Sequence, residues 1–320
     1  MLTNDIWTEI RRFDSCEGNV SKFTFSKDNA LVETVLYRYP NYETRTVICC
    51  SVMCGCPIGC RFCGSGDYFV RSLTADEIVS EVLKTLQTTN VDPKDIKKLQ
   101  VMFMSMGEPM LNMKNVLEAI EELHWLLPNA DLLLSTVGPD VDYIPLFDLS
   151  KKIDKLGLQF SIHESTDAAR NELIPFVKKL TLEQIAEVGN HWFEETGRHP
   201  FFNYCAHDNN TSVEDVGRLA SVFAPEIWNA TVSVICERNE GMPTRNDHQR
   251  SLAVNFSSAL LQAGFNVRVF DPAGQDDIGG GCGQLPHYQQ WVKDHASLAR
   301  PSIGNGKKIV HVPGSLVNIE

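Results

Sequence analysis

Three cysteines near the start of the chain have a spacing that can support chemistry. Cys56, Cys60 and Cys63 form a CxxxCxxC run, and six of the ten cysteines lie in the segment 49–63. An iron–sulfur cubane held by only three thiolates keeps one iron without a protein ligand, so that iron can bind a substrate or a cofactor directly. The run therefore predicts a metal cluster that takes part in a reaction.

Zinc is the competing interpretation of this segment, because Cys54 adds a fourth thiolate and four-cysteine zinc sites are common. Structural zinc usually uses two ligand pairs separated by a dozen or more residues, and the sequence has no second CxxC pair. Crowded cysteines also fit a reducing compartment, where thiols serve as ligands or nucleophiles. The spacing favours the cluster.

The elements that must position these cysteines alternate between short apolar runs and amphipathic stretches, which indicates βα units and a parallel sheet. The amphipathic stretches begin with helix-capping residues such as Thr74, Thr181 and Ser212. Strands are predicted at 46–51, 99–104, 131–135, 158–162, 201–206, 231–235 and 267–270. Such repeats predict an α/β barrel or partial barrel, in which the loops after the strands carry the chemistry.

Polar residues follow the first four predicted strands. The cysteine run follows the first strand and Gly107-Glu108-Pro109 follows the second, while Ser135 and Ser161-Ile162-His163 mark the ends of the next two. Any one of these could merely cap a strand or a helix. Because the carboxyl ends of parallel strands meet at one rim, four successive polar ends favour a ligand site.

Composition limits the class of protein. With 320 residues and 43% hydrophobic content the chain can bury a full core. Segment 1–13 has no apolar signal region, and no stretch approaches the roughly 18 apolar residues of a membrane span, so we expect a cytoplasmic protein. The net charge of -12 argues against a broad nucleic-acid contact surface.

The first 45 residues follow a different pattern. Segments 23–25 and 31–37 indicate a β-hairpin. We expect residues 1–45 to form a small N-terminal β extension. Residues 46–320 are expected to form one catalytic domain that includes the glycine-rich loop around Cys282.

The sequence resembles the radical S-adenosylmethionine (SAM) enzymes, and within them the RlmN/Cfr-type methyl synthases that methylate adenosine carbons in RNA. The resemblance extends from about Val32 to Leu285. The motifs that carry it are the CxxxCxxC run, Val32-Glu33-Thr34-Val35, Cys49, Met106-Gly107-Glu108-Pro109, Leu134-Ser135-Thr136, Ser161-Ile162-His163, Asn239 and Asp276-Asp277-Ile278-Gly279-Gly280-Gly281-Cys282-Gly283-Gln284-Leu285. The resemblance implies a partial (β/α)6 TIM-like radical SAM barrel and a methyltransferase that uses two SAM molecules per turnover.

In the implied mechanism, Cys282 takes a methyl group from one SAM as a thiolate. A second SAM, bound to the open iron of a [4Fe–4S] cluster held by the CxxxCxxC run, yields a 5′-deoxyadenosyl radical that abstracts hydrogen from the methylated Cys282. The resulting methylene radical adds to an sp2 carbon of the substrate. Cys49 then resolves the covalent link by forming a disulfide with Cys282, and Glu33 is the proton acceptor.

The resemblance also implies SAM-binding positions and partners. The SAM-binding positions are Gly107, Glu108, Ser135, Ser161, Ile162, His163 and Asn239. A reducing partner such as flavodoxin or ferredoxin is implied, and the substrate is either a small adenine-like, nucleotide-like or other heteroaromatic molecule or a structured RNA. The remaining cysteines, which are Cys16, Cys50, Cys54, Cys205 and Cys236, are predicted to be packing residues.

The chain also departs from the family. Only about thirty residues precede Glu33, so we expect the N-terminal accessory helical domain to be lacking, and segment 269–275 has no basic stretch before Cys282. These departures affect RNA recognition rather than the SAM chemistry. Two other interpretations stay open: a radical SAM enzyme that does not methylate, and a zinc or iron–sulfur protein without catalysis.

Overall fold

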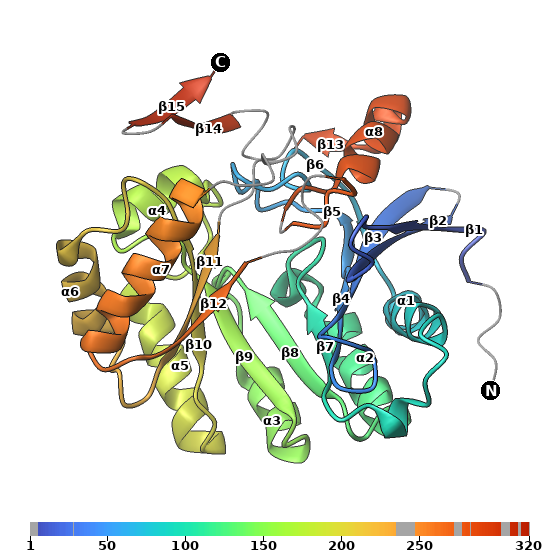
Figure 1. The fold of residues 1–320 in the computed structure, drawn as a ribbon, viewed down its shortest axis with the longest axis horizontal. Helices are drawn as coiled ribbons and strands as arrows, with labels where there is room; N and C mark the ends of the chain where they lie inside the picture. The colour runs from blue at the N-terminus through green and yellow to red at the C-terminus, as the bar shows by residue number, and fades with distance from the viewer. Residues whose placement is uncertain are drawn as a thin grey trace.

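The computed structural model describes residues 6–27, 29–234, 247–271, 277–281, 283–301, 308–312 and 315–319. Its main feature is a ten-stranded sheet in the order β1-β2-β3-β4-β7-β8-β9-β10-β11-β12 (Figure 1). The pairs from β1 to β4 are antiparallel, and those from β4 to β12 are parallel. The predicted parallel sheet is therefore confirmed.

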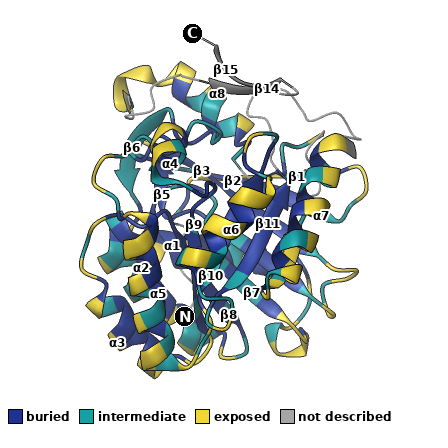
Figure 2. Cartoon of the chain, turned by 90° about the vertical axis from the view of Figure 1, so that its left-hand side faces the viewer, coloured by how far each residue is buried: buried dark blue, intermediate teal, exposed yellow. Residues whose placement is uncertain are grey.

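The parallel strands are short, and most of them are buried. They are β4 (Thr46–Cys50), β7 (Leu99–Phe103), β8 (Asp131–Thr136), β9 (Leu156–Ser161), β10 (Phe201–Ala206), β11 (Asn229–Val234) and β12 (Asn266–Phe270). Helices cover the outer face of this sheet and turn their exposed residues to solvent (Figure 2). This arrangement explains the near-continuous apolar runs of the strands, because a parallel sheet is covered on both faces.

The helices begin where the sequence predicts caps. Thr74, Thr181 and Ser212 each accept a hydrogen bond from the main-chain N–H three residues later and complete capping boxes. The helices are α1 (Ala75–Gln87), α2 (Met113–Leu126), α3 (Ile144–Lys152), α4 (Asp167–Leu173), α5 (Leu182–Thr196), α6 (Val213–Val222), α7 (Asp247–Gln262) and α8 (Pro286–Asp294). Within the described ranges, none of them is long and apolar enough to cross a membrane.

The N-terminal residues extend the same sheet. β2 (Val20–Lys27) and β3 (Ala30–Arg38) form the predicted hairpin, and β3 pairs with β4. The sequence analysis did not predict β1 (Glu9–Asp14) at the sheet edge, nor the small sheet of β5 (Met53–Gly55), β6 (Tyr68–Ser72) and β13 (Arg300–Pro301). A separate hairpin joins β14 (Lys308–Val312) to β15 (Ser315–Ile319).

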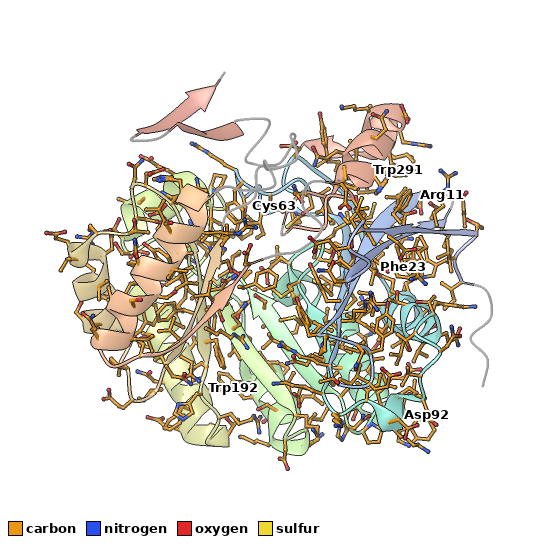
Figure 3. The ribbon with its side chains drawn as sticks, viewed as in Figure 1. Arg11, Phe23, Cys63, Asp92, Trp192 and Trp291 are labelled. Carbon is orange, nitrogen blue, oxygen red and sulfur yellow. The ribbon has the colours of Figure 1, made fainter. Side chains whose placement is uncertain are left out.

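The sheet curves into an incomplete barrel. β3 and β12 share no hydrogen bonds, yet the rings of Tyr37 and Phe270 meet edge to face with their centroids 6.5 Å apart. Cys63 lies toward one end of the barrel and Trp192 toward the other (Figure 3). The carboxyl ends of the parallel strands thus form a rim around the cysteine loop.

Candidate active site

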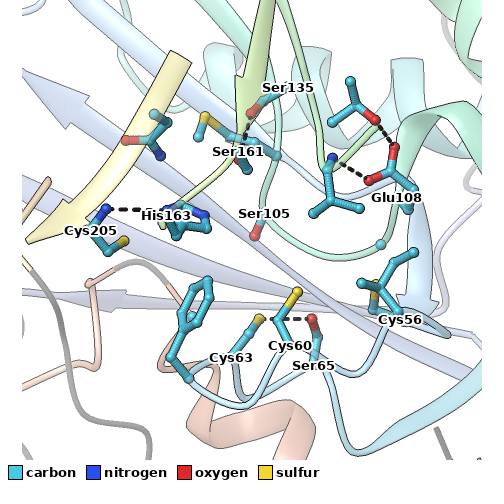
Figure 4. Close-up of a pocket in the computed structure, with 18 of the residues that line it drawn as sticks. Cys56, Cys60, Cys63, Ser65, Ser105, Glu108, Ser135, Ser161, His163 and Cys205 are labelled. Carbon is cyan, nitrogen blue, oxygen red and sulfur yellow. Dashed lines mark hydrogen bonds between the residues drawn. The ribbon is translucent and has the colours of Figure 1, made fainter. Parts of the chain in front are cut away.

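The cysteine loop leads from β4 through β5 to β6, and main-chain hydrogen bonds fix its shape. The N–H of Cys56 donates to the carbonyl of Tyr68 at 3.0 Å, and that of Cys63 to the carbonyl of Cys60 at 3.1 Å. All three cysteines line one cavity (Figure 4). Its volume, including the part open to solvent, is ≈ 740 Å³.

The chemistry of the three thiols fits a multi-iron cluster. Burial raises the pKa of Cys56 and of Cys60 well above its ordinary value, and the neighbouring thiols raise it further. The thiolates therefore require a positive partner. In the described part of the chain, no three His, Cys, Asp or Glu side chains converge on a point that could hold one metal ion. A cubane does not need that convergence, because each thiolate binds a different iron, whereas structural zinc needs four ligands around one ion.

Glu108 places a carboxylate in the cavity wall. It follows β7 and accepts hydrogen bonds from Thr136 Oγ1 at 2.5 Å, from Val137 N at 2.9 Å and from Met110 N at 3.0 Å. Burial raises the pKa of this carboxyl to about 7, although the three hydrogen bonds act in the opposite direction. Glu108 can therefore bind an ammonium group, which would stabilise its ionised form.

Gly107, just before Glu108, has a conformation that other residues rarely adopt. Its φ is 94°, and an added Cβ would lie 2.5 Å from the Cβ of Met53. Glycine is required here because the chain passes closely over the cysteine loop in a left-handed conformation.

His163, after β9, presents a neutral imidazole to the cavity. Burial lowers its pKa to about 3. Its Nδ1 accepts a hydrogen bond from Cys205 N at 3.2 Å, so the ring proton resides on Nε2, which is left as a donor. The rings of Phe62 and His163 meet edge to face, with their centroids 4.9 Å apart.

Two serines line the cavity between Glu108 and His163, at the ends of β8 and β9. The hydroxyls of Ser135 and Ser161 are 3.3 Å apart. The side chain of Ile162 does not reach the cavity: it is buried in the core, and its main-chain N–H donates to the carbonyl of Asn203 at 3.1 Å. Any contact of Ile162 with a ligand therefore has to use main-chain atoms.

The cavity also has polar lining residues that the sequence analysis did not select. They are Ser65, Ser105, Thr136, Asn203, Cys205 and Ser233. Cys205 was assigned to packing, but its position opposite Ser233 in the β10–β11 register brings both to the cavity. The signal was the period-two alternation of Asn203 and Cys205 on a strand adjacent to β9, which directs both side chains to one face.

Glu33 and Cys49 do not line this cavity. Glu33 is fully buried on β3, where its carboxylate lies 2.9 Å from the ammonium of Lys22 and accepts a hydrogen bond from Tyr288 N at 2.8 Å. Cys49 is partly buried on β4 and packs against the same apolar cluster as Ile278. Both residues therefore lie close to the glycine-rich loop rather than to the three cysteines.

That loop is held by side chains of the N-terminal strands. Lys22 Nζ donates to the carbonyl of Gly279, and the hydroxyl of Tyr37 donates to the carbonyl of Gly280 at 2.9 Å. Farther along, Gly283 lines the cavity, and its carbonyl accepts a hydrogen bond from Gly64 N in the cysteine loop. The chain before position 282 is thus held by the N-terminal strands, and the residue after it lines the cavity. Cys282 itself and Asn239 lie outside the described residues.

Comparison with known proteins finds related sequences. No protein-family model matches the chain. The chain is similar to a protein from Dictyoglomus turgidum described as a probable dual-specificity RNA methyltransferase RlmN, with 31% identity over 278 residues, which are 84% of this chain and 76% of that one. A protein of the same description from Heliobacterium modesticaldum is 32% identical over 276 residues, which cover 81% of this chain and 68% of the relative.

One solved structure has a similar fold. A radical SAM methyltransferase from Sphaerobacter thermophilus matches with a TM-score of 0.70 and 24% sequence identity, covering 87% of this chain and 80% of that one. This likeness supports the partial barrel inferred from the curvature of the sheet.

Proposed function

The chain belongs to the RlmN family of radical SAM methyltransferases, and we propose that it transfers a methyl group from SAM through Cys282 to an sp2 carbon of an adenine-like heteroaromatic ring. One observation carries the proposal. The cavity lined by Cys56, Cys60 and Cys63 is also bordered by Gly283, the residue next to Cys282. The three cysteines and the loop that contains Cys282 therefore border one cavity.

We assign the cavity residues to two cofactors. Cys56, Cys60 and Cys63 hold a [4Fe–4S] cluster. Together the cluster and SAM supply a 5′-deoxyadenosyl radical. Glu108 accepts the ammonium group of SAM, and the Nε2–H of His163 donates to an acceptor of the bound cofactor. The other SAM-binding positions in the proposal are Gly107, Ser135, Ser161, Ile162 through its main chain, and Asn239.

Three further residues carry out the transfer in the proposal. Cys282 attacks the methyl carbon of SAM as a thiolate, so its sulfur becomes a thioether. Cys49 later forms a disulfide with Cys282 and releases the product, and two electrons from a partner such as flavodoxin or ferredoxin restore the thiols. Glu33 accepts the proton that leaves the ring. Its carboxylate already holds Lys22, and protonation weakens that ion pair.

Mass spectrometry of the purified protein tests the methyl carrier. Protein isolated with active cluster and SAM should carry one added methyl group on Cys282, and Cys282→Ala protein should carry none. Cys16→Ala is the matched control, since Cys16 is an exposed thiol whose main chain touches the same loop at Asp277. A fully active protein without methyl on Cys282 would favour a non-methylating radical SAM enzyme.

Iron analysis tests the cluster separately. Anaerobic reconstitution should give four irons per chain, as a [4Fe–4S] cluster requires. Stoichiometric zinc without iron would establish the zinc interpretation and remove the radical chemistry altogether.

An adenosine in RNA is a second candidate substrate, favoured by the description of the relatives as RNA methyltransferases. The net charge of -12 opposes extensive phosphate contact. We therefore expect weak binding of ribosomal RNA fragments. Each neutralised phosphate contributes about -0.7 to -0.9 to the slope of the logarithm of the binding constant against the logarithm of the salt concentration, so few phosphate contacts should give a shallow slope. Submicromolar, steeply salt-dependent binding together with methylation of an adenosine in the fragment would assign RNA instead of a small molecule.

A further inference from the structure

Arg170 is a fully buried arginine on α4 that the proposed mechanism does not use. Its guanidinium donates one hydrogen bond to the carbonyl of Leu180 at 2.7 Å and another to the carbonyl of Val137. Its Nε has no hydrogen-bond partner. The side chain is 0% exposed, so water does not complete its hydrogen bonding.

Among the described residues no carboxylate is paired with this guanidinium, although Asp167 lies near enough for its charge to act on it. Asp167, one helical turn earlier, instead accepts a hydrogen bond from Leu182 N at 3.0 Å, and among the described residues Arg170 forms no ion pair. Burial lowers the pKa of Arg170 to about 10, which still leaves it charged at neutral pH. A buried cation is unfavourable unless an anion lies close by.

Two of the cluster cysteines also lie near this part of α4. Cys56 and Cys60 pack in one buried cluster with Val137, whose carbonyl Arg170 binds, and with Leu173 at the end of α4. In addition, the N–H of Arg61 in the cysteine loop donates to the carbonyl of Leu173 at 3.0 Å.

The buried guanidinium has an unused donor at Nε and no ion-pair partner among the described residues, and a cluster bound by the neighbouring cysteines would bring negative charge beside it. A [4Fe–4S] cluster with three thiolates has a net negative formal charge, and reduction makes this charge more negative by one unit. A fixed cation beside it therefore stabilises the reduced cluster more than the oxidised cluster.

We propose that Arg170 is the buried counter-charge of the cluster and raises its reduction potential, so that the cluster can accept the electron that SAM cleavage requires. This inference rests on the cluster assignment of the proposed function but not on methyl transfer through Cys282. Arg170 is a positioning residue in this role, since it acts through the cluster and not on the substrate.

The test compares Arg170→Met, Arg170→Lys and wild-type protein, each with a reconstituted cluster. The midpoint potential is measured by redox titration followed by electron paramagnetic resonance. For an effective dielectric constant of about 20, loss of a unit charge about 12 Å from the cluster lowers the ratio of reduced to oxidised cluster about tenfold, which is about 59 mV for one electron, and a shorter distance gives a larger shift. Arg170→Met should lower the midpoint potential by this order of magnitude. Arg170→Lys keeps the positive charge and should have a midpoint potential close to that of wild type.

Arg198→Met is the matched control. Arg198 also donates to a carbonyl, that of Ser150 at 2.8 Å, and its Nε likewise lacks a partner. It lies over the ring of Trp192, which is at the other end of the barrel from Cys63 (Figure 3). Its replacement should leave the potential unchanged.

Thermal unfolding of apo and cluster-loaded protein separates this role from a structural one. Loading the cluster should raise the melting temperature less in Arg170→Met than in wild type, whereas a purely structural role would lower both forms equally. An unchanged potential in a loaded Arg170→Met protein would overturn the inference and leave the proposed function standing. Failure of wild-type protein to bind iron would overturn both. A shifted potential with no methyl on Cys282 would support the inference and contradict only the carrier.

Discussion

Replacing Lys22 with Met leaves the carboxylate of Glu33 buried without its cation. In the structure the two charged groups are 2.9 Å apart, with side-chain exposures of 1% and 0%, so solvent cannot take over the role of Lys22. Removing one partner of such a pair typically costs about 3–5 kcal/mol of folding stability. The variant also removes the donor to the carbonyl of Gly279. We therefore expect the free energy of unfolding to fall by about 3–5 kcal/mol.

The double variant Lys22→Met/Glu33→Gln separates charge from hydrogen bonding. It removes both charges, while a glutamine oxygen can still accept from Tyr288 N. Its loss should therefore be smaller than that of the single variant, about 1–2 kcal/mol for the missing hydrogen bond to Gly279. Lys155→Met is the control, because Lys155 also contacts a carboxylate, Asp131 at 3.3 Å, but at 43% exposure. It should lose less than about 1 kcal/mol.

Urea unfolding followed by tryptophan fluorescence measures these differences, and hydrogen exchange reports on the loop. The Gln284 amide, which donates to the carbonyl of Gly281 in the loop, should exchange faster in both variants that lack Lys22 if Lys22 anchors the loop. Equal destabilisation of Lys22→Met and Lys155→Met would refute the reasoning, because it would mean that the buried pair is no more important than an exposed one.

Three further predictions concern the chemistry. Changing any one of the three cluster cysteines to Ala should abolish the [4Fe–4S] signal, measured by iron content and visible absorption; retention of a complete cluster would remove that cysteine from the ligand set. Cys49→Ala should accumulate enzyme covalently linked to substrate, detected as a mass increase, whereas Cys282→Ala should form no link; normal turnover by Cys49→Ala would exclude it as the resolving thiol. Because burial raises the pKa of Glu108 to about 7, its carboxyl is protonated below that pH, so SAM affinity should increase as the pH rises through about 7. Calorimetry should show that Glu108→Gln removes this dependence, and an unchanged pH profile would exclude Glu108 as the ammonium partner.

The parallel strands follow from the sequence because each depends on a local pattern of residues. The predicted strand at 131–135 corresponds to β8, whose apolar residues are buried on both faces of a covered sheet. The capping boxes likewise involve residues only three apart. β1 was missed because its side chains are mostly exposed and show no alternation, and β5 was missed because it has three residues.

The cavity could be predicted in outline, because polar residues at successive strand ends meet wherever the strands are parallel. The charged residues that pack around the cavity and its loop could not be predicted from the sequence. Lys22 lies in a buried stretch of β2, and nothing near it in the sequence indicates Glu33 or Gly279 as its partners. Arg170 lies on a helix of seven residues, too short for a periodic pattern, and its relation to Cys60 exists only after folding.

The contacts between the N-terminal strands and the glycine-rich loop also limit how early this part of the protein can fold during translation. Lys22 and its acceptor Gly279 are 257 residues apart, and Glu33 and Tyr288 are 255 apart. At about 5–20 residues per second, a ribosome needs roughly 13 to 50 s to synthesise the second partner after the first. Throughout that time the β2–β3 hairpin carries two charges that have to remain hydrated. The β2–β3 hairpin can therefore make these contacts only after β12 has been synthesised, and Gly283 can complete the lining of the cavity only after that.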